Sequence, residues 1–409
     1  MNTLTVTLKQ HTPLIHFQHD QEGATLRASE VKPKLDRFIL TKLGNGDYGK
    51  GKTEAKKSGL TIGGQETALD YKMKFIVNEA PEIFYNNEVQ KDRQGNAQTV
   101  IRKDGRIIKK LKPYPLFFAN LNTNIDNPLE YKCFSMLHKP FEMKLQSFNK
   151  DLLDQIEKQT INLGQFFQYT NFGTRQSKGF GSFYIEENDK LHEDIEDLKY
   201  RFSVDVRSES KKWLDLFTAI DLFYKSLRSG INICWGDKFY MKPAIFQYAK
   251  DRNYDWDKKL IKDFFFNNNS PKQQNDFLFK DLLGLSSEES WMSYGTNISK
   301  EHSTSDIKRF QSPIIIKPIL RDGYFDVFVD ANPNAKELFE KYCGQVFNII
   351  RSKNPEEKLK LKTFPNFDIN DFLEFALLKN DIGRLTTGIN HEKFLELTNI
   401  YNEIKKEHE

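Results

Sequence analysis

The sequence has little of what marks several familiar protein classes. Among its 409 residues are three cysteines, Cys133, Cys234 and Cys343, which lie far apart. Three widely spaced cysteines, an odd number, provide neither a disulfide framework nor a Cys-x-x-Cys metal site. Such a set is typical of a protein in a reducing compartment. No apolar run approaches the ~20 residues that a membrane span needs, and the opening residues lack the basic and apolar regions of a secretory signal. These absences predict a cytoplasmic protein without a membrane partner.

Common ligand motifs are absent as well. No GxxxxGK[ST] pattern occurs, which excludes a Walker A loop, and no GxGxxG opens a helix after a strand. His11, His16 and His19 lie close together, but no cysteine joins them, and on a strand and turn their side chains would point in different directions. The sequence therefore predicts no metal site and no cofactor.

Charge of one sign is not in large excess. The chain has 61 Lys and Arg against 57 Asp and Glu, a formal net charge of +4. This balance alone is too weak to indicate a nucleic-acid partner, so the position of the charges has to decide.

Aromatic residues, in contrast, are plentiful. With 34 Phe and 16 Tyr, the chain can build cores although only 38% of its residues are apolar and 29% are charged. Its length exceeds what one core usually fills, which favours two domains. We place them at residues 1–228 and 229–409.

The amino-terminal half predicts alternating strands and helices. Alternation from Leu4 to Lys9 indicates a strand, as do residues 69–77 and 141–148, and helical spacing indicates helices over 25–40 and 149–169. Asn149 is the expected N-cap of the latter, and Pro33 is expected at a start or kink of the former. Residues 41–66, rich in glycine and lysine, predict a long mobile loop, and Asp104-Gly105 predicts a hairpin.

The carboxy-terminal half predicts more helix. Helices are expected at 257–266, 275–283, 334–350 and 366–378, and two strands, 314–319 and 324–329, are joined by a turn at Arg321-Asp322-Gly323. The order of elements favours an α+β fold with two ferredoxin-like modules and helical insertions. The second module would be degenerate and start near Ile231.

A glycine-rich segment is the sharpest signal for function. Gly173, Gly179 and Gly181 allow close backbone approach and positive φ. Arg175 and Lys178 are spaced to meet phosphates, and Phe180 offers a stacking face. The alternative interpretation is an ordinary β-turn with surface charges.

Two basic stretches add to this signal. Residues 32–57 and 91–112 hold 16 of the 61 basic residues but only five acidic ones. Such local excess attracts phosphates in a salt-dependent manner. The alternative is a pair of solvated insertions. The first stretch comprises Lys32, Lys34, Arg37, Lys42, Lys50, Lys52, Lys56 and Lys57, and the second comprises Lys91, Arg93, Arg102, Lys103, Arg106, Lys109, Lys110 and Lys112.

Three blocks resemble the RAMP superfamily of CRISPR-associated proteins. The pattern G-x-R-x-x-K-G-F-G-S at 173–182 is similar to the family's glycine-rich loop. The pair "TP" at 12–13 and "LR-x-S-x-x-K" at 26–32 resembles its opening, and "SP-hydrophobic-K-P" at 312–318 resembles a strand of its two-module members. The layout is most like the tail-capping subunit of type III-B (Cmr) effector complexes. Pro33 departs from the Lys-Gly start of the first helix that relatives have.

The resemblance implies an RRM/RAMP-type fold and a non-catalytic, RNA-binding subunit of a ribonucleoprotein complex for antiviral defence. Its partners would be CRISPR RNA, target RNA and other Cmr-type subunits. The residues expected to contact RNA are Arg27, Lys32, Lys34, Arg37, Lys50, Lys52, Lys56, Lys57, Gly173, Arg175, Lys178, Gly179, Phe180 and Gly181.

Two other functions remain open at this point. A metal-independent endoribonuclease that processes the guide precursor would use His16 or His19 with a lysine, and Asp20 or Asp36 are less favoured catalytic candidates. A scaffold that contacts only protein would have no RNA affinity.

Overall fold

The computed structural model describes most of the chain and divides it into two compact units. The described residues are 1–15, 25–63, 67–86, 91–92, 94–101, 105–110, 131–158, 161–191, 195, 198–207, 212–233, 237–267, 276–304 and 306–409. The first unit comprises Met1–Leu198 and Lys317–Asp322, and the second comprises Lys199–Ile316 and Gly323–Glu409.

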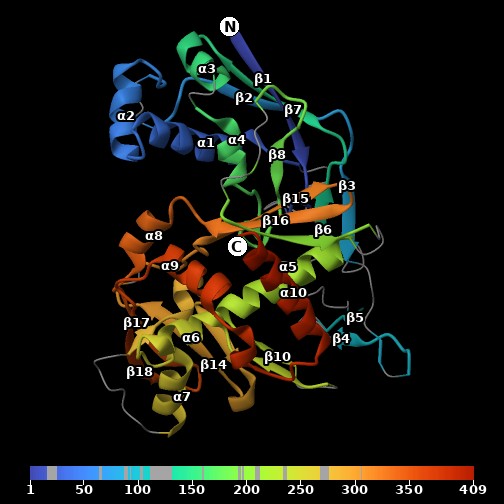
Figure 1. Ribbon diagram of the computed structural model, residues 1–409, viewed down its shortest axis with the longest axis vertical. Helices are drawn as coiled ribbons and strands as arrows, with labels where there is room; N and C mark the ends of the chain where they lie inside the picture. The colour runs from blue at the N-terminus through green and yellow to red at the C-terminus, as the bar shows by residue number, and fades with distance from the viewer. Residues whose placement is uncertain are drawn as a thin grey trace. The chain divides into compact units, whose positions relative to one another are not determined.

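The first unit combines helices with three groups of strands (Figure 1). Its helices are α1 (Ala28–Leu43), α2 (Tyr48–Lys57), α3 (Lys150–Glu157), α4 (Leu163–Gln168) and the 3-10 helix η2 (Gln176–Lys178). Its strands are β1 (Asn2–Gln10), β2 (Lys72–Ile76), β3 (Glu82–Asn86), β4 (Thr99–Ile101), β5 (Ile107–Lys109), β6 (Tyr131–Met136), β7 (Phe141–Ser147) and β8 (Phe183–Ile185).

The main sheet of this unit has the order β2-β7-β1-β8, and every neighbouring pair is antiparallel. Alternate residues of β1, including Leu4, Val6 and Leu8, are buried, and so are alternate residues of β7. This period of two gives the sheet an apolar face. Helices α1, α3 and α4 lie beside the sheet (Figure 1). The predicted strand at Leu4–Lys9 and the predicted N-cap at Asn149, whose side chain accepts from the Asp151 amide, are confirmed.

The predicted mobile loop at 41–66 is wrong, because α2 occupies its centre. The helix is capped by Asp47, and it packs directly on α1. A Cβ added at Gly51 would lie 1.6 Å from the Leu40 carbonyl oxygen, and one at Gly44 would lie 1.9 Å from the Asp47 carbonyl oxygen. These glycines therefore serve close helix packing rather than loop flexibility.

Other expectations in this unit hold with changes. Pro33 lies inside α1, which continues through it to Leu43. The single helix expected over 149–169 is two helices, α3 and α4, and the second has its own cap at Asn162. Strands β4 and β5 form the predicted hairpin, with Gly105 at a φ of 83°. Strands β3 and β6 form a separate antiparallel pair.

The second unit contains the remaining elements, except that strand β15 is divided between the units. Its helices are α5 (Lys212–Arg228), α6 (Ala244–Asp251), α7 (Asp257–Asn267), α8 (Ala335–Tyr342), α9 (Ile369–Glu374), α10 (Glu392–Lys406), the 3-10 helices η4 (Lys280–Leu283), η5 (Met292–Tyr294) and η7 (Ile382–Leu385), and the π-helix η6 (Phe375–Lys379). The strands are β9 (Tyr200–Asp205), β10 (Ile231–Ile233), β11 (Phe239–Met241), β12 (Phe277–Leu278), β13 (Glu288–Trp291), β14 (Thr296–His302), β15 (Ile314–Arg321), β16 (Tyr324–Ala331), β17 (Val346–Arg351), β18 (Asn354–Thr363) and β19 (Thr386–Thr387).

Three sheets organise this unit, with the orders β15-β16-β9, β10-β11-β19 and β12-β18-β17-β14-β13. Strand β9 pairs with β16, and helices α5 and α10 pack on β9 through Phe202, Phe223 and Tyr401. By these contacts, β9 and α5 belong to the second unit.

Two helices predicted for the second half are replaced in part by strands. Where a helix was expected over 275–283, the described residues form β12 and the short η4. The helix expected over 334–350 ends at Tyr342, because Cys343 has an extended backbone (φ −68°, ψ 139°). Gly344 then adopts a φ of 75°, and β17 follows. The strand pair β15–β16 and its turn, with Asp322 and Gly323 at positive φ, are confirmed. Within the described residues, no helix is long and apolar enough to cross a membrane.

Candidate nucleic-acid interface

The glycine-rich loop runs from Phe172 to Ser182 and leads into β8. Helix η2 forms its tip, with Arg175 at a φ of 59° before it and Gly179 at a φ of 81° after it. Left-handed backbone is costly for a residue with a side chain, so the surrounding structure must hold Arg175 in place. Both Arg175 and Lys178 are half-buried.

The base of the loop is fixed by the segment after β1. The Thr12 hydroxyl donates to the Gly179 carbonyl (2.7 Å) and accepts from the Ser182 amide (2.9 Å). The Gly181 amide donates to the Pro13 carbonyl, and the Thr174 amide donates to the Ile15 carbonyl. A Cβ at Gly181 would lie 2.0 Å from the Phe172 carbonyl oxygen, so glycine is required there. The "TP" segment is thus the support on which the loop rests.

Helix α1 holds the other side of the loop. Glu30, in its first turn, accepts from the Gly173 amide at 2.6 Å. Lys34 donates to the Asn171 carbonyl (3.1 Å) and to Oε1 of Gln176 (3.0 Å). Burial lowers the pKa of Lys34 against the opposing effect of Glu30. The contacts of Lys34 are therefore directed at the loop itself.

Lys32 is likewise engaged within the first unit. Its Nζ donates to Asp36 (2.7 Å) and to the Leu69 carbonyl (3.0 Å), and it lies 4.1 Å from the centroid of the Tyr71 ring. Asp36 is buried, and burial raises the pKa of its carboxyl group although Lys32 opposes this. Asp36 therefore forms an ion pair within α1, with Lys32.

The expectation that Phe180 offers a stacking face is wrong. Its ring is 0% exposed, as are the rings of Phe172 and Phe183. An aromatic residue between two glycines at positive φ is turned into the core here, where it contributes burial instead of a surface for bases.

The remaining expected contact residues lie along α1 and α2. Arg27 occupies the N-cap position of α1. The guanidinium of Arg37 lies over the Tyr48 ring at 4.6 Å, and Lys52 lies 5.5 Å from the same ring. Lys50, Lys56 and Lys57 are exposed on α2. The first basic stretch is therefore carried on a helical hairpin.

The second basic stretch is described only in part. Lys91, Arg106, Lys109 and Lys110 are exposed around the β4–β5 hairpin. Arg93, Arg102, Lys103 and Lys112 lie outside the described residues.

Of the four candidate catalytic residues, Asp36 alone is among the described residues. His16, His19 and Asp20 lie outside them. His11 is buried, and its pKa is lowered well below the usual value, first by burial and then by Lys317. Over the part of the chain that the structure describes, no three His, Cys, Asp or Glu side chains are grouped to hold a metal ion.

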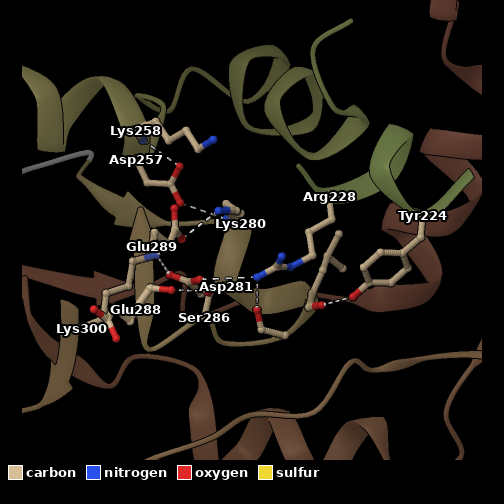
Figure 2. A network of polar contacts seen from close by, with 12 residues as sticks. Tyr224, Arg228, Asp257, Lys258, Lys280, Asp281, Ser286, Glu288, Glu289 and Lys300 are labelled. Carbon is tan, nitrogen blue, oxygen red and sulfur yellow. Dashed lines mark hydrogen bonds and ion pairs between the residues drawn. The ribbon is translucent and has the colours of Figure 1, made fainter. Parts of the chain in front are cut away.

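Sequence reasoning missed a buried charge network in the second unit (Figure 2). Lys300 contacts Asp281 at 2.5 Å and Glu289 at 3.0 Å, and Lys280 contacts Glu289 at 2.7 Å. Arg228 donates to the Gly284 carbonyl and lies 3.9 Å from Asp281. These residues come from α5, η4, β13 and β14, so no local sequence pattern could have predicted the network.

The electrostatics of this network favour the charged forms of Glu289 and Lys300. Burial opposes ionisation of Glu289, but Lys300 and Lys280 outweigh it and lower its pKa. Burial likewise disfavours the Lys300 ammonium, yet Asp281 and Glu289 raise its pKa. Asp257, which accepts from the Lys280 amide, has its pKa raised by burial.

Chemically, a loop with two cations beside a helical hairpin with exposed lysines can bind a phosphate chain without reading bases. Backbone of fixed geometry limits the entropy lost on binding. The first unit has this arrangement in residues 12–15, 27–57 and 172–182.

No curated protein matches the chain. Among solved structures, a Type III-B Cmr-beta complex bound to cognate target RNA contains a chain that is 12% identical, with coverage of 80% of this chain and 94% of that one and a TM-score of 0.35. A crystal structure of Cmr1 from Pyrococcus furiosus in its apo form is 11% identical, with coverage of 95% and 98% and a TM-score of 0.33. These likenesses are too low to carry an argument.

The family comparison is stronger because it covers nearly the whole sequence. Residues 1–231 match the Cmr1 N-terminal domain, and residues 240–405 match the Cmr1 C-terminal domain. The first match includes the glycine-rich loop and the segments that support it, and the resemblance to the RAMP superfamily is confirmed. The chain therefore belongs to the Cmr1 family.

Proposed function

We propose that this chain is a non-catalytic, RNA-binding subunit of a type III-B CRISPR ribonucleoprotein, where it contacts the guide RNA or the guide–target duplex. Membership of the Cmr1 family supports this assignment. The observation that carries it is the glycine-rich loop, in which Arg175 precedes η2 and Lys178 ends it. The base of the loop is held by Thr12, whose hydroxyl donates to the Gly179 carbonyl, and by Pro13, whose carbonyl accepts from the Gly181 amide.

Recognition in this proposal is of the phosphate backbone. Phosphates are bound by the loop cations and by the exposed α2 residues Lys50, Lys56 and Lys57. Base pairing between guide and target determines the sequence specificity. The buried Phe180 takes no part in stacking. Lys32 and Lys34 act on the protein side, where they hold α1 against its neighbours.

The proposed architecture is two ferredoxin-like modules. The first sheet supports it, since the chain order is β1, α1, β2, β7, α3 with α4, then β8, and the spatial order is β2-β7-β1-β8. The order β15-β16-β9, with α5 after β9, supports a second, incomplete module.

The test is a double charge reversal in the loop, Arg175→Glu with Lys178→Glu, measured by fluorescence anisotropy with a single-stranded RNA over a salt series. Two lost phosphate contacts should flatten the slope of log affinity against log salt by about 1.4, because each contact contributes about 0.7 on a single strand. The matched control reverses two exposed lysines of the second unit, Lys336→Glu with Lys341→Glu, for the same change in net charge. If both variants lose RNA affinity equally, or if the loop variant loses none, the proposed contact is refuted.

A further inference from the structure

Lys317 is a buried lysine whose role the RNA proposal has not used. It lies in β15, in the "SP-hydrophobic-K-P" segment, and its contacts group it with the first unit. Its side chain is 0% exposed. The Nζ atom donates to the Phe183 carbonyl (2.8 Å), to the Thr170 carbonyl (3.0 Å) and to Oδ1 of Asn171 (3.3 Å).

These three acceptors bracket the glycine-rich loop. Thr170 and Asn171 directly precede it, and Phe183 directly follows it. One amine group therefore bonds to both ends of the loop at once. All three acceptors are neutral, and none of the ion pairs among the described residues joins Lys317 to a carboxylate. Burial lowers the pKa of Lys317 well below its usual value, because no carboxylate offsets the cost of a buried charge. A lysine held at this place despite that cost calls for a structural reason.

The same strand holds the loop through a second residue. The His11 amide donates to the Ser182 carbonyl (2.9 Å), and Nδ1 of His11 accepts from the Leu320 amide (3.1 Å). An accepting Nδ1 requires the neutral ring with its proton on Nε2. Burial and the nearby Lys317 charge lower the pKa of His11, in agreement with that form. Strand β15 is therefore connected to the end of the loop twice. Lys317 bonds to it directly, and Leu320 is connected to it through His11.

We propose that Lys317 is a positioning residue, whose buried amine group fixes both ends of the glycine-rich loop and thereby the places of Arg175 and Lys178. The effect on RNA rests on the proposed function, whereas the effect on loop order stands by itself. Asn171 links Lys317 to the tip of the loop, because its side-chain amide also donates to the Gln176 carbonyl in η2 (2.8 Å).

The direct test is hydrogen exchange of the full chain with Lys317→Met, which keeps length and apolar volume but removes every donor. Amides of residues 172–183 should exchange at least about tenfold faster, while those of β7 stay protected. The matched control is Lys158→Met, an exposed lysine of the same unit. Unchanged loop exchange in Lys317→Met would overturn the proposal. Should that variant not fold, Lys317→Gln, which retains a neutral amide donor, is measured in its place with the same two outcomes.

RNA affinity then separates positioning from general destabilisation. Lys317→Met should weaken binding about tenfold in the native background but less than about twofold in the Arg175→Glu/Lys178→Glu background, since its effect passes through those side chains. Equal losses in both backgrounds would refute a role through the loop. If the charge reversal alone leaves affinity unchanged, the proposed function fails, and loop exchange still decides the inference on Lys317.

Discussion

Replacing Lys300 with methionine removes the cation that joins two carboxylates in the buried network of the second unit (Figure 2). In the intact network, Arg228, Lys280 and Lys300 balance Asp257, Asp281 and Glu289. The side chain of Lys300 is 2% exposed and that of Asp281 is 0% exposed. After the substitution, Asp281 keeps only the more distant Arg228, at 3.9 Å, as a cationic partner among the described residues.

The expected loss follows from the burial of the group that is left behind. Removing one partner of a buried ion pair costs about 3–5 kcal/mol of unfolding free energy, because the other charge remains in the interior without compensation. For a unit of this size, such a loss lowers the melting temperature by about 6–20 °C. The double variant Lys300→Met/Asp281→Asn should lose less, because it leaves equal numbers of cations and carboxylates.

Tryptophan fluorescence during urea unfolding measures this loss in the right part of the molecule. The chain has four tryptophans, and the three that the structure describes, Trp213, Trp256 and Trp291, belong to the second unit. The matched control is Lys341→Met, which breaks a surface pair with Glu337 in the same unit, where the lysine side chain is 71% exposed. This control should change the unfolding free energy by at most about 0.5 kcal/mol. A loss for Lys300→Met no larger than the control's would show that the network contributes nothing through its charges.

Two further predictions concern the helical hairpin and acid stability. Gly51→Ala should undock α2 and make its amides exchange faster, because the new Cβ would meet the Leu40 carbonyl oxygen at 1.6 Å; Gly49→Ala in the same helix meets only the end of a side chain at 3.3 Å and should leave protection intact. Equal protection in both variants would contradict the packing argument. The pKa of Glu289 is lowered in the folded state, so its contribution to stability is present above about pH 4.5 and is lost as pH falls. Below that pH, the unfolding free energy of the native chain should fall more steeply than that of Glu289→Gln, by up to about 1.4 kcal/mol per pH unit. Parallel plots of unfolding free energy against pH for the two proteins would refute this role of Glu289.

Several elements of the fold could be predicted from local patterns. Alternation from Leu4 to Lys9, the cap at Asn149 and the Asp322-Gly323 turn each depend on near neighbours, and the structure has them. The glycines of 41–66 were misleading because the sequence does not tell a flexible glycine from one that two helices need for close contact. Gly44 and Gly51 are of the second kind.

The candidate site was predictable as a segment but not in the direction of its side chains. Phe180 follows a glycine in a cationic loop, a context that also fits a base-stacking residue, and only the tertiary fold turns it inward. Lys32 and Lys34 share a helix with Glu30 and Asp36, and their engagement depends on Leu69 and Asn171, far along the chain. The Lys300 network likewise joins residues without a common local motif.

The order in which the ribosome delivers the segments gives Lys317 a further consequence. A nascent chain that ends at residue 231, the limit of the matched N-terminal domain, already carries β1, β2, β7 and β8 but lacks the amine group between Thr170 and Phe183. At usual elongation rates, on the order of ten seconds of synthesis separate the end of the sheet from the arrival of that lysine. During this interval the loop that carries Arg175 and Lys178 lacks the side chain that joins its two ends, so it takes its final shape only after residue 317 has been synthesised.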